Sequence, residues 1–263
     1  MLQRRLIPVP ALADNYIWLL AGNDGRCLVV DPGEAPPVLA TLQRERLTPT
    51  AILLTHHHPD HIAGVGGILA ACPGLPVIAP HDERIATAKR RVADGERVQI
   101  DAPRADFEVI GTPGHTRSHI AFFGAGVVFA GDTLFSVGCG RMFEGTPPVM
   151  LASLDRLSQL PGDTQLCCGH EYTLANCAFA LSVDAGNADL QRRAEQARAL
   201  RARGEPTVPV ALSLEQATNP FLRVDTPAIR ASCADAIGAA GAEDRVARFA
   251  WLRREKDSFR APA

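Results

Sequence analysis

Short apolar runs alternate with turn-forming residues and short helical segments through the first two-thirds of the chain. Residues 16–20 and 27–30 are apolar and strand-like, and they flank Gly-Asn-Asp-Gly at residues 22–25, which is a strong hairpin signal. Residues 31–33 (Asp-Pro-Gly) turn the chain, and residues 35–47 follow with helical character. This alternation predicts an α/β architecture.

The pattern changes after the first 173 residues. Residues 174–203 are rich in Ala, Leu, Arg and Gln, which are good helix formers, and they contain few β-branched residues. Prolines then break the chain into a looped region, and two further helical stretches follow at residues 227–238 and 243–257. We therefore predict two domains, an α/β domain over residues 1–173 and an α-helical domain over residues 174–263.

The most informative polar residues follow one of the apolar runs. Residues 51–54 (Ala-Ile-Leu-Leu) lead directly into Thr-His-His-His-Pro-Asp-His at residues 55–61. Four residues of this stretch carry side chains that bind metals, and they are His56, His58, Asp60 and His61. Affinity tags and surface histidine tracts also cluster imidazoles, but they stand at termini or in low-complexity stretches rather than after a core strand.

Strand geometry separates these four residues into two pairs. If the strand continues by a residue or two, His56 and His58 point to the same face and His57 to the other, because side chains alternate along a strand. We therefore expect His57 to pack or to face solvent rather than to bind metal. Asp60 and His61 come after a proline, where the chain has turned toward a second position. Two displaced pairs favour two metal ions over one.

Three further strand-like runs each end in one residue of a metal-binding type. The runs at residues 107–110, 127–131 and 164–169 precede His115, Asp132 and His170, respectively. A lone His or Asp after a strand is usually a turn residue or a cap. Four strands that end in the same way indicate a shared metal site.

These motifs together resemble the metallo-β-lactamase superfamily, whose pattern is His-x-His-x-Asp-His, then Gly-His, an Asp after an apolar strand and a later His. The resemblance implies a four-layer αββα sandwich with a binuclear metal site at one edge, followed here by the C-terminal α-helical domain. It implies that Asp132 bridges two ions, the first bound by His56, His58 and His115 and the second by Asp60, His61 and His170. His119 follows a ligand loop and is either a support for a ligand or a hydrogen-bonded structural histidine.

Finer motifs resemble the glyoxalase II family, the hydroxyacylglutathione hydrolases, over nearly the whole chain. The matching segments are Asp-Asn-Tyr at residues 14–16, Gly-Cys-Gly-Arg-Met-Phe-Glu-Gly-Thr at 138–146, Glu-Tyr-Thr at 171–173, Asn-Pro-Phe at 219–221 and Arg-Arg-Glu-Lys-Asp-Ser-Phe at 253–259. The resemblance implies that the glutathione part of the substrate is bound by Arg141, Tyr172, Arg253 and Lys256.

A cationic pocket is also reasonable on physical grounds. Glutathione carries two carboxylates and an amine, so its site needs fixed positive charge. Arg253 and Lys256 are three positions apart and share a face of a helix, although a solvated charged helix gives the same pattern. Some members of the family have Lys in place of Arg141, which changes the geometry of an anion contact. Some have Tyr in place of Phe143, whose ring offers no hydroxyl contact.

The reaction implied by the resemblance is hydrolysis of S-(2-hydroxyacyl)glutathione, chiefly S-D-lactoylglutathione, to glutathione and D-lactate, the second step of methylglyoxal detoxification. We expect two divalent ions, with zinc first and iron or manganese as alternatives, because all three accept imidazole and carboxylate ligands. Two such ions lower the pKa of a shared water, and Asp60 and Asp132 would orient the resulting nucleophile. The leaving thiolate, whose conjugate acid has a pKa of about 8.5, departs without a general acid.

Composition limits the partners and the compartment. The chain of 263 residues has a net charge of −2 and a pI near 6.4, which gives no sign of a nucleic-acid or membrane partner. No apolar run approaches the ~20 residues that span a bilayer, and the first residues lack the apolar core of a signal peptide. Seven cysteines without paired spacing indicate a reducing compartment. We therefore expect a cytoplasmic protein that acts on a small molecule, and a monomer.

Three other functions remain open from the sequence. One is another hydrolase of the same superfamily, acting on a β-lactam or on RNA. A second is a mononuclear iron dioxygenase acting on glutathione persulfide, a family with a similar histidine motif but without the long helical tail that carries Arg253 and Lys256. The third is a protein whose metals only stabilise the fold, although a structural site is normally closed by protein ligands.

Overall fold

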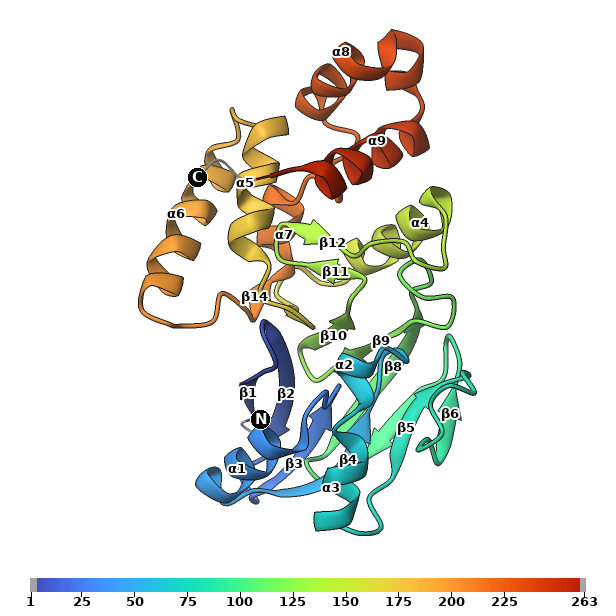
Figure 1. The fold of residues 1–263 in the computed structure, drawn as a ribbon, viewed down its shortest axis with the longest axis vertical. Coiled ribbons are helices and arrows are strands. Elements are labelled where there is room, and N and C mark those ends of the chain that lie inside the picture. Colours follow the sequence, from blue (N-terminus) through green and yellow to red (C-terminus); the bar gives the residue numbers. More distant parts are fainter. Residues whose placement is uncertain (1–3, 261–263) are drawn as a thin grey trace. The chain divides into compact units, whose positions relative to one another are not determined.

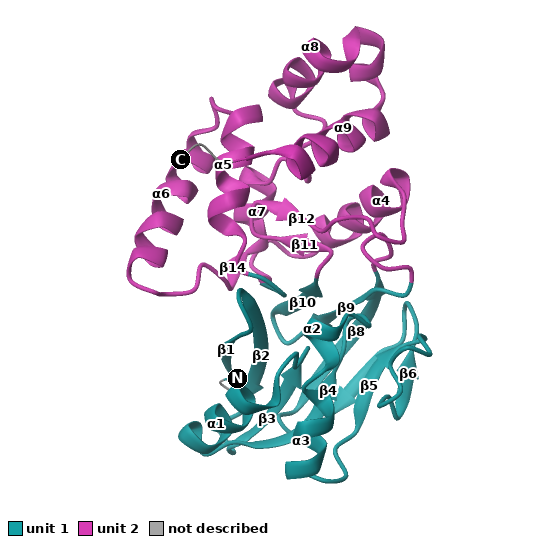
Figure 2. Cartoon of the chain, in the orientation of Figure 1, with its two compact units in different colours: residues 1–111, 118–131, 167–170 teal, residues 112–117, 132–166, 171–263 magenta. Residues whose placement is uncertain are grey.

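The computed structural model describes residues 4–260, and these fall into two compact units that interleave along the chain. Unit 1, teal in Figure 2, comprises residues 1–111, 118–131 and 167–170. Unit 2, magenta in Figure 2, comprises residues 112–117, 132–166 and 171–263. Both units are described separately below.

The first sheet of unit 1 joins an antiparallel hairpin to parallel strands (Figure 1). Its strands, in spatial order, are β1 (Arg5–Ala11), β2 (Asn15–Ala21), β3 (Arg26–Val30), β4 (Thr48–Leu53), β5 (Val77–Pro80) and β6 (Arg90–Val92). The predicted hairpin at residues 22–25 joins β2 to β3, and it places Trp18 opposite Val30. From β3 onward the strands pair in parallel.

Both faces of this sheet are buried, as the apolar runs predict. On one face Leu19 of β2 belongs to a core that includes Val38 of α1 (Ala35–Glu45) and Ile68 of α3 (Val65–Ala71). On the other face the indole Nε1 of Trp18 donates to the main-chain oxygen of Cys168, at 2.9 Å. Each fully buried side chain of this size contributes about 1.5–3 kcal/mol to folding.

The second sheet of unit 1 contains four antiparallel strands and one further strand beside them. Its strands, in spatial order, are β13 (Gln165–Cys168), β10 (Val127–Gly131), β9 (Ile120–Gly124), β8 (Ala105–Gly111) and β7 (Arg97–Ile100). Only the last two residues of β13 belong to unit 1. The rings of Phe107 and Phe129 pack with their centroids 6.0 Å apart, in the buried core of this sheet.

Unit 2 is mainly helical. Its helices are α4 (Pro147–Ser158), α5 (Thr173–Val183), α6 (Ala188–Ala202), α7 (Leu212–Thr218), α8 (Pro227–Glu243) and α9 (Arg245–Ser258). The helical stretch predicted at residues 174–203 is two helices, because Asn187 caps α6 by accepting hydrogen bonds from the amides of Asp189 and Leu190. α8 continues past residue 238 through a kink at Gly238, whose φ of +74° suits glycine.

A buried carboxylate holds the small hairpin of unit 2 in place. This hairpin pairs β11 (Leu134–Phe135) with β12 (Gly138–Cys139). Glu215 of α7 accepts hydrogen bonds from the Ser136 hydroxyl at 2.8 Å and from the Val137 amide at 2.6 Å. Burial raises the pKa of the Glu215 carboxyl. The hairpin lies in the chain between the predicted ligand Asp132 and the predicted substrate contact Arg141.

The remaining regular elements are short. α2 (Pro59–Ile62) is a single turn in unit 1, and β14 (Val210–Ala211) pairs with the start of β13 in unit 2. Among the helices of residues 4–260, none combines the length and hydropathy needed to cross a bilayer.

Candidate metal centre

Three predicted ligands converge in unit 1. The Nε2 atom of His61 lies 3.5 Å from Oδ2 of Asp60, and the Nε2 atom of His170 lies 3.3 Å from the same oxygen. His61 is in the one-turn helix α2 and His170 follows β13, so segments far apart in the chain supply the three ligands. One ligand atom from each of the three residues lies within 4.8 Å of the others. Imidazole nitrogen and carboxylate oxygen are the donor set that divalent transition metals prefer.

His56 and His58 lie beside this group in unit 1. Their rings are 4.8 Å apart, and the ring of His56 is 4.1 Å from that of His61. His56 is fully buried two residues beyond the end of the strand-forming run, and His58 is the N-cap of α2. His57 instead lies 3.4 Å from a carboxylate oxygen of Asp82. The strand alternation expected for these residues does not extend to them, because β4 ends at Leu53, and the ring of His57 lies 4.8 Å from that of His58.

The Nδ1 atoms of His61 and His170 contact carboxylate oxygen atoms, which leaves their Nε2 atoms available to a metal. His170 Nδ1 lies 2.8 Å from Oδ1 of Asp14, and His61 Nδ1 lies 3.1 Å from Oδ2 of Asp31. A carboxylate only accepts, so both Nδ1 atoms carry the proton. This arrangement fixes the tautomer and orients the ring of a metal-binding histidine.

Thr55 extends this arrangement to His56. Its hydroxyl donates to Oδ2 of Asp31 at 2.7 Å and lies 3.0 Å from Nδ1 of His56, so it accepts the His56 proton. Its amide donates to the other oxygen of Asp31 at 2.8 Å. Asp31 therefore orients both His56 and His61.

The turn at Asp31-Pro32-Gly33 is required by a close approach of backbones. A Cβ atom on Gly33 would lie 2.0 Å from the carbonyl oxygen of Asp60. Only glycine allows the turn to pass this close to the ligand helix. Asn15 secures the same residue from β2, because its side-chain amide donates to Oδ2 of Asp60 at 3.0 Å.

The other two predicted ligands, His115 and Asp132, lie in unit 2. His115 Nε2 is 3.5 Å from Oδ2 of Asp132. His115 Nδ1 donates to the carbonyl oxygen of Arg141 at 2.9 Å, so its Nε2 atom is again the one available to a metal. Gly140 allows a close approach here, since a Cβ atom would lie 1.9 Å from the carbonyl oxygen of Asp132. The ring of Phe143 packs against the His115 ring at 5.3 Å.

His119 is a packed neighbour of a predicted ligand. It is 1% exposed, and its ring stacks on that of His56 with centroids 4.8 Å apart and an interplanar angle of 26°. Gly131, with φ of +48°, leaves the space for this ring, because a Cβ atom there would lie 2.7 Å from Nε2 of His119. This contact places His119 beside a predicted ligand, as either of the two roles considered for it requires.

Two of the predicted substrate contacts are exposed in unit 2. Arg141 is 62% exposed, and its Nε atom lies 3.2 Å from Oδ1 of Asp257. Tyr172 is 36% exposed and is the N-cap residue of α5, and its ring packs on that of Phe135 at 5.2 Å. Both side chains can reach a dissolved ligand.

The two predicted substrate contacts on α9, Arg253 and Lys256, are more buried than the side chains of a fully solvated helix. Arg253 is 4% exposed, and its guanidinium donates to the carbonyl oxygen of Cys139 at 2.7 Å and to Oδ1 of Asp257 at 2.9 Å. Lys256 donates to the carbonyl oxygen of Ala175 at 2.9 Å. Burial, followed by the charge of Arg253, lowers the pKa of Lys256 to about 8.

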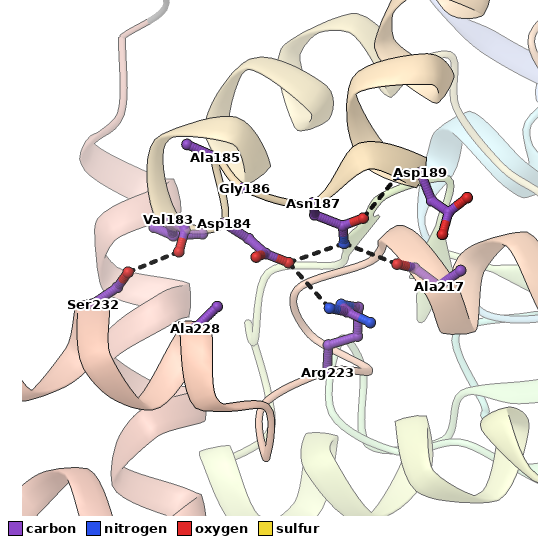
Figure 3. A pocket seen from close by; sticks show the side chains of 10 residues that line it. All are labelled: Val183, Asp184, Ala185, Gly186, Asn187, Asp189, Ala217, Arg223, Ala228 and Ser232. Carbon is purple, nitrogen blue, oxygen red and sulfur yellow. Dashed lines mark hydrogen bonds and ion pairs between the residues drawn. The ribbon is translucent and has the colours of Figure 1, made fainter.

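The polar groups that line a crevice elsewhere in unit 2 bond mainly to one another. The crevice has a volume of about 490 Å³ and is drawn in Figure 3. Asn187 donates to the Asp184 carboxylate at 3.0 Å and to the carbonyl oxygen of Ala217 at 2.9 Å, and Arg223 pairs with Asp184 at 3.3 Å (Figure 3). These groups satisfy one another and connect α5, α6 and α7.

Sequence reasoning missed the carboxylates that orient the histidines. Asp14 was noted only as part of a family segment, and Asp31 only as a turn residue. The signal for Asp31 was its position directly after the apolar run at residues 27–30, the same placement that identified Asp132.

Comparisons with known proteins agree with this geometry. The family model described as "Metallo-beta-lactamase superfamily" matches residues 13–170, and the model described as "Hydroxyacylglutathione hydrolase C-terminus" matches residues 171–259. A hydroxyacylglutathione hydrolase of Xanthomonas campestris pv. campestris is 57% identical over 98% of this chain and 100% of its own length.

Solved structures share the fold. The BLEG-1 B3 metallo-beta-lactamase has a TM-score of 0.63 at 24% identity, with 84% of this chain and 99% of that chain covered. The protein TTHA1623, solved in a di-iron-bound form, has a TM-score of 0.59 at 27% identity, with 82% of this chain and 100% of that chain covered. The predicted metallo-β-lactamase fold with a C-terminal helical region is therefore confirmed, and the chain belongs to the hydroxyacylglutathione hydrolase (glyoxalase II) family of the metallo-β-lactamase superfamily.

Proposed function

We propose that this protein hydrolyses the thioester of S-(2-hydroxyacyl)glutathione, chiefly S-D-lactoylglutathione, to glutathione and a 2-hydroxy acid. The observation that carries the proposal is the convergence of two Nε2 atoms on one carboxylate oxygen of Asp60, with both Nδ1 atoms already bound to carboxylates. A full-length relative named hydroxyacylglutathione hydrolase, at 57% identity, supports the same reaction.

Two divalent metal ions complete the site in this proposal. We assign His56, His58 and His115 to the first ion, Asp60, His61 and His170 to the second, and Asp132 to both. The donor set accepts zinc, iron or manganese, and zinc is our first choice. The 27% identical protein solved in a di-iron-bound form supports iron as an alternative. When bound, the ions would lower the pKa of a water molecule and polarise the thioester carbonyl.

The protein residues then position the reacting groups. Asp60 is held by Asn15 and is 35% exposed, so its carboxylate can accept a hydrogen bond from the attacking water. Asp132 offers a second carboxylate for the same water. The departing glutathione thiolate is the conjugate base of a thiol with a pKa of about 8.5, so it leaves without a proton donor.

Glutathione recognition is assigned to unit 2, through Arg141, Tyr172, Arg253 and Lys256. Arg141 and Lys256 supply positive charge for the carboxylates of the tripeptide, and Tyr172 supplies a hydroxyl. Arg253 is buried, so its contribution is to hold the Cys139 carbonyl and Asp257 beside these groups. In this proposal residues 1–173 form the catalytic domain, which also contributes Arg141 and Tyr172 to substrate binding, and residues 174–263 form the substrate-binding domain.

The cellular setting follows from the same reaction. We propose a cytoplasmic monomer that acts on a small molecule in methylglyoxal detoxification, with no nucleic-acid or membrane partner. The net charge of −2 and the buried or half-buried free cysteines support this setting.

The test is hydrolysis of S-D-lactoylglutathione by the purified protein, followed as loss of thioester absorbance. Metal content is measured in the same sample, and a chelated sample is the control. A lactoyl thioester of a small thiol that lacks the glutathione part separates thioesterase activity from glutathione recognition. Fast turnover of the glutathione thioester, slower turnover of the small thioester and loss of both on chelation are expected. A sample with about two metals per chain and no turnover of either thioester would overturn the proposal.

Other functions considered from the sequence are less favoured. The match of residues 171–259 to the hydroxyacylglutathione hydrolase C-terminus covers the helical tail that a persulfide dioxygenase was expected to lack. Oxygen consumption with glutathione persulfide would still identify that activity. Hydrolysis of a β-lactam or of RNA by the same sample would identify another hydrolase of the superfamily.

A further inference from the structure

Asp82 is a buried carboxylate that the proposed reaction does not use. It lies in unit 1, two residues beyond the end of β5, and is 7% exposed. Arg84 donates to it through Nε and Nη2, each at 2.8 Å, and the hydroxyl of Ser118 donates to Oδ2 at 2.5 Å. Oδ2 also lies 3.4 Å from Nδ1 of His57.

These contacts connect two segments that carry residues of the metal centre. His57 stands in the chain between the predicted ligands His56 and His58. Ser118 directly precedes His119, whose ring stacks on that of His56 at 4.8 Å. The Asp82 carboxylate therefore connects the His56–His58 segment with the Ser118-His119 segment, which packs against His56.

The Asp82 carboxylate is buried, and its hydrogen bonds and ion pair hold it in place. Burying an ionised carboxylate is costly unless it is paired and hydrogen-bonded. Arg84 meets this requirement, and its hydrogen bond holds the pKa of the Asp82 carboxyl well below its usual range. Arg91 donates to the main-chain oxygen of Asp82, which fixes the backbone as well.

We propose that Asp82 is a positioning residue for the metal centre, acting on His56 and His58 through His57 and on His119 through Ser118. The inference rests on the proposed metal centre. Groups that orient metal ligands from outside the ligand set typically change metal affinity by 10- to 100-fold when they are lost. Asp82 acts through an intervening residue on each side, so we expect a loss of roughly tenfold, at the low end of that range.

The test measures metal binding directly. Wild-type protein, Asp82→Asn, Ser118→Ala and Asp106→Asn are stripped of metal, and zinc affinity is measured by competition with a chromophoric chelator. Asp106 is the matched control, because it also pairs with an arginine in unit 1, at 2.7 Å from Arg97, on an exposed strand surface. The visible spectrum of the cobalt(II) form reports the geometry of the ligands, and the melting temperature of the metal-free protein reports folding.

The expected result is weaker zinc binding and an altered cobalt spectrum in Asp82→Asn, a smaller change in Ser118→Ala and no change in Asp106→Asn. Wild-type affinity and spectrum in both Asp82→Asn and Ser118→Ala would overturn the inference while leaving the metal centre intact. If Asp82→Asn does not fold, Ser118→Ala decides alone, because it keeps the Arg84 pair. Failure of the wild-type protein to bind metal would instead overturn the proposed function.

Discussion

The two units carry different kinds of chemistry on different kinds of structure. In unit 1, the rings of His56, His61 and His170 are each oriented by a hydroxyl or a carboxylate, as for His61 by Asp31 at 3.1 Å. In unit 2, the predicted glutathione contacts Arg141 and Lys256 are cations on a loop and a helix, paired with a half-exposed carboxylate and a carbonyl. The ligand rings of unit 1 are therefore preorganised for metal binding, whereas unit 2 presents charge and also holds the two remaining predicted ligands, His115 and Asp132.

Metal binding and substrate binding require side chains that are held with different rigidity. A metal ligand displaced by a fraction of an ångström loses its bond, so its support must be stiff, and a buried strand end provides that support. An anionic substrate is attracted over several ångströms by a cation whose side chain can adjust. A metal ligand therefore tolerates less side-chain motion than a glutathione contact does. Mutations of the two kinds of residue should differ in their kinetic effects.

The largest expected effect distinguishes a ligand from a substrate contact. Asp132→Ala should lower kcat by roughly 10³-fold or more, since bound metal supplies several kcal/mol of transition-state stabilisation. Arg141→Ala should raise KM and leave kcat near the wild-type value, because the proposed contact of Arg141 is with the part of the substrate that does not react. Steady-state kinetics with S-D-lactoylglutathione measure both. Equal losses of kcat in the two variants would contradict the separation of metal ligands from glutathione contacts.

The next effect concerns the carboxylate behind His170. Asp14→Asn keeps the size of the side chain but replaces a carboxylate that lies 2.8 Å from His170 Nδ1. Metal affinity should fall by roughly 10- to 100-fold, because the ring loses the group that sets its tautomer and basicity. Competition with a chelator measures the change. Asp24→Asn, in the exposed hairpin between β2 and β3, is the control and should bind metal as the wild-type protein does.

The strand-end ligands could be predicted from sequence because a strand fixes where its last side chain lies. Apolar runs before His56, Asp132 and His170 gave both the element and the position of the residue after it. The groups that orient them could not be found in this way. Asp14 is 156 positions from His170 in the chain, and an aspartate after a strand is most often an ordinary turn residue.

The helical unit was harder to predict in detail. The sequence indicated helices over residues 174–203, 227–238 and 243–257, and all of these regions are helical, but the break at residues 184–187 depends on the cap at Asn187. Arg253 was expected on a charged helix, and it is 4% exposed instead. Its burial depends on the carbonyl of Cys139, more than one hundred positions earlier in the chain, and helical periodicity carries no information on such a contact.

Arg253 and Arg254 allow a buried and an exposed arginine of the same helix to be compared. Arg253→Ala removes a buried guanidinium and leaves the Cys139 carbonyl without its donor, so the free energy of unfolding should fall by about 2 kcal/mol. Arg254→Ala changes an exposed neighbour on the same helix and should lie within about 0.5 kcal/mol of wild type. Urea denaturation of both variants measures the difference. If Arg253→Ala instead lowers substrate affinity and leaves the free energy of unfolding unchanged, Arg253 binds the substrate rather than stabilising the fold.

The smallest expected effect is a pH dependence of KM that arises from Lys256 in unit 2. Burial lowers the pKa of Lys256 to about 8 from its usual 10.5, so the ammonium is charged below that pH and becomes neutral as the pH rises through it. A lost charge-assisted contact weakens glutathione binding, and KM should rise roughly three- to tenfold between about pH 7 and pH 9.5.

Lys256→Arg supplies the decisive comparison, because a guanidinium stays charged over this whole range. In that variant the rise in KM should disappear, whatever its KM at pH 7. The kcat of both proteins, measured in the same series, reports titration at the metal centre instead. If KM of the variant climbs with pH as steeply as that of the wild-type protein, the titrating group lies outside the α9 cations, and the charge that unit 2 presents does not depend on Lys256.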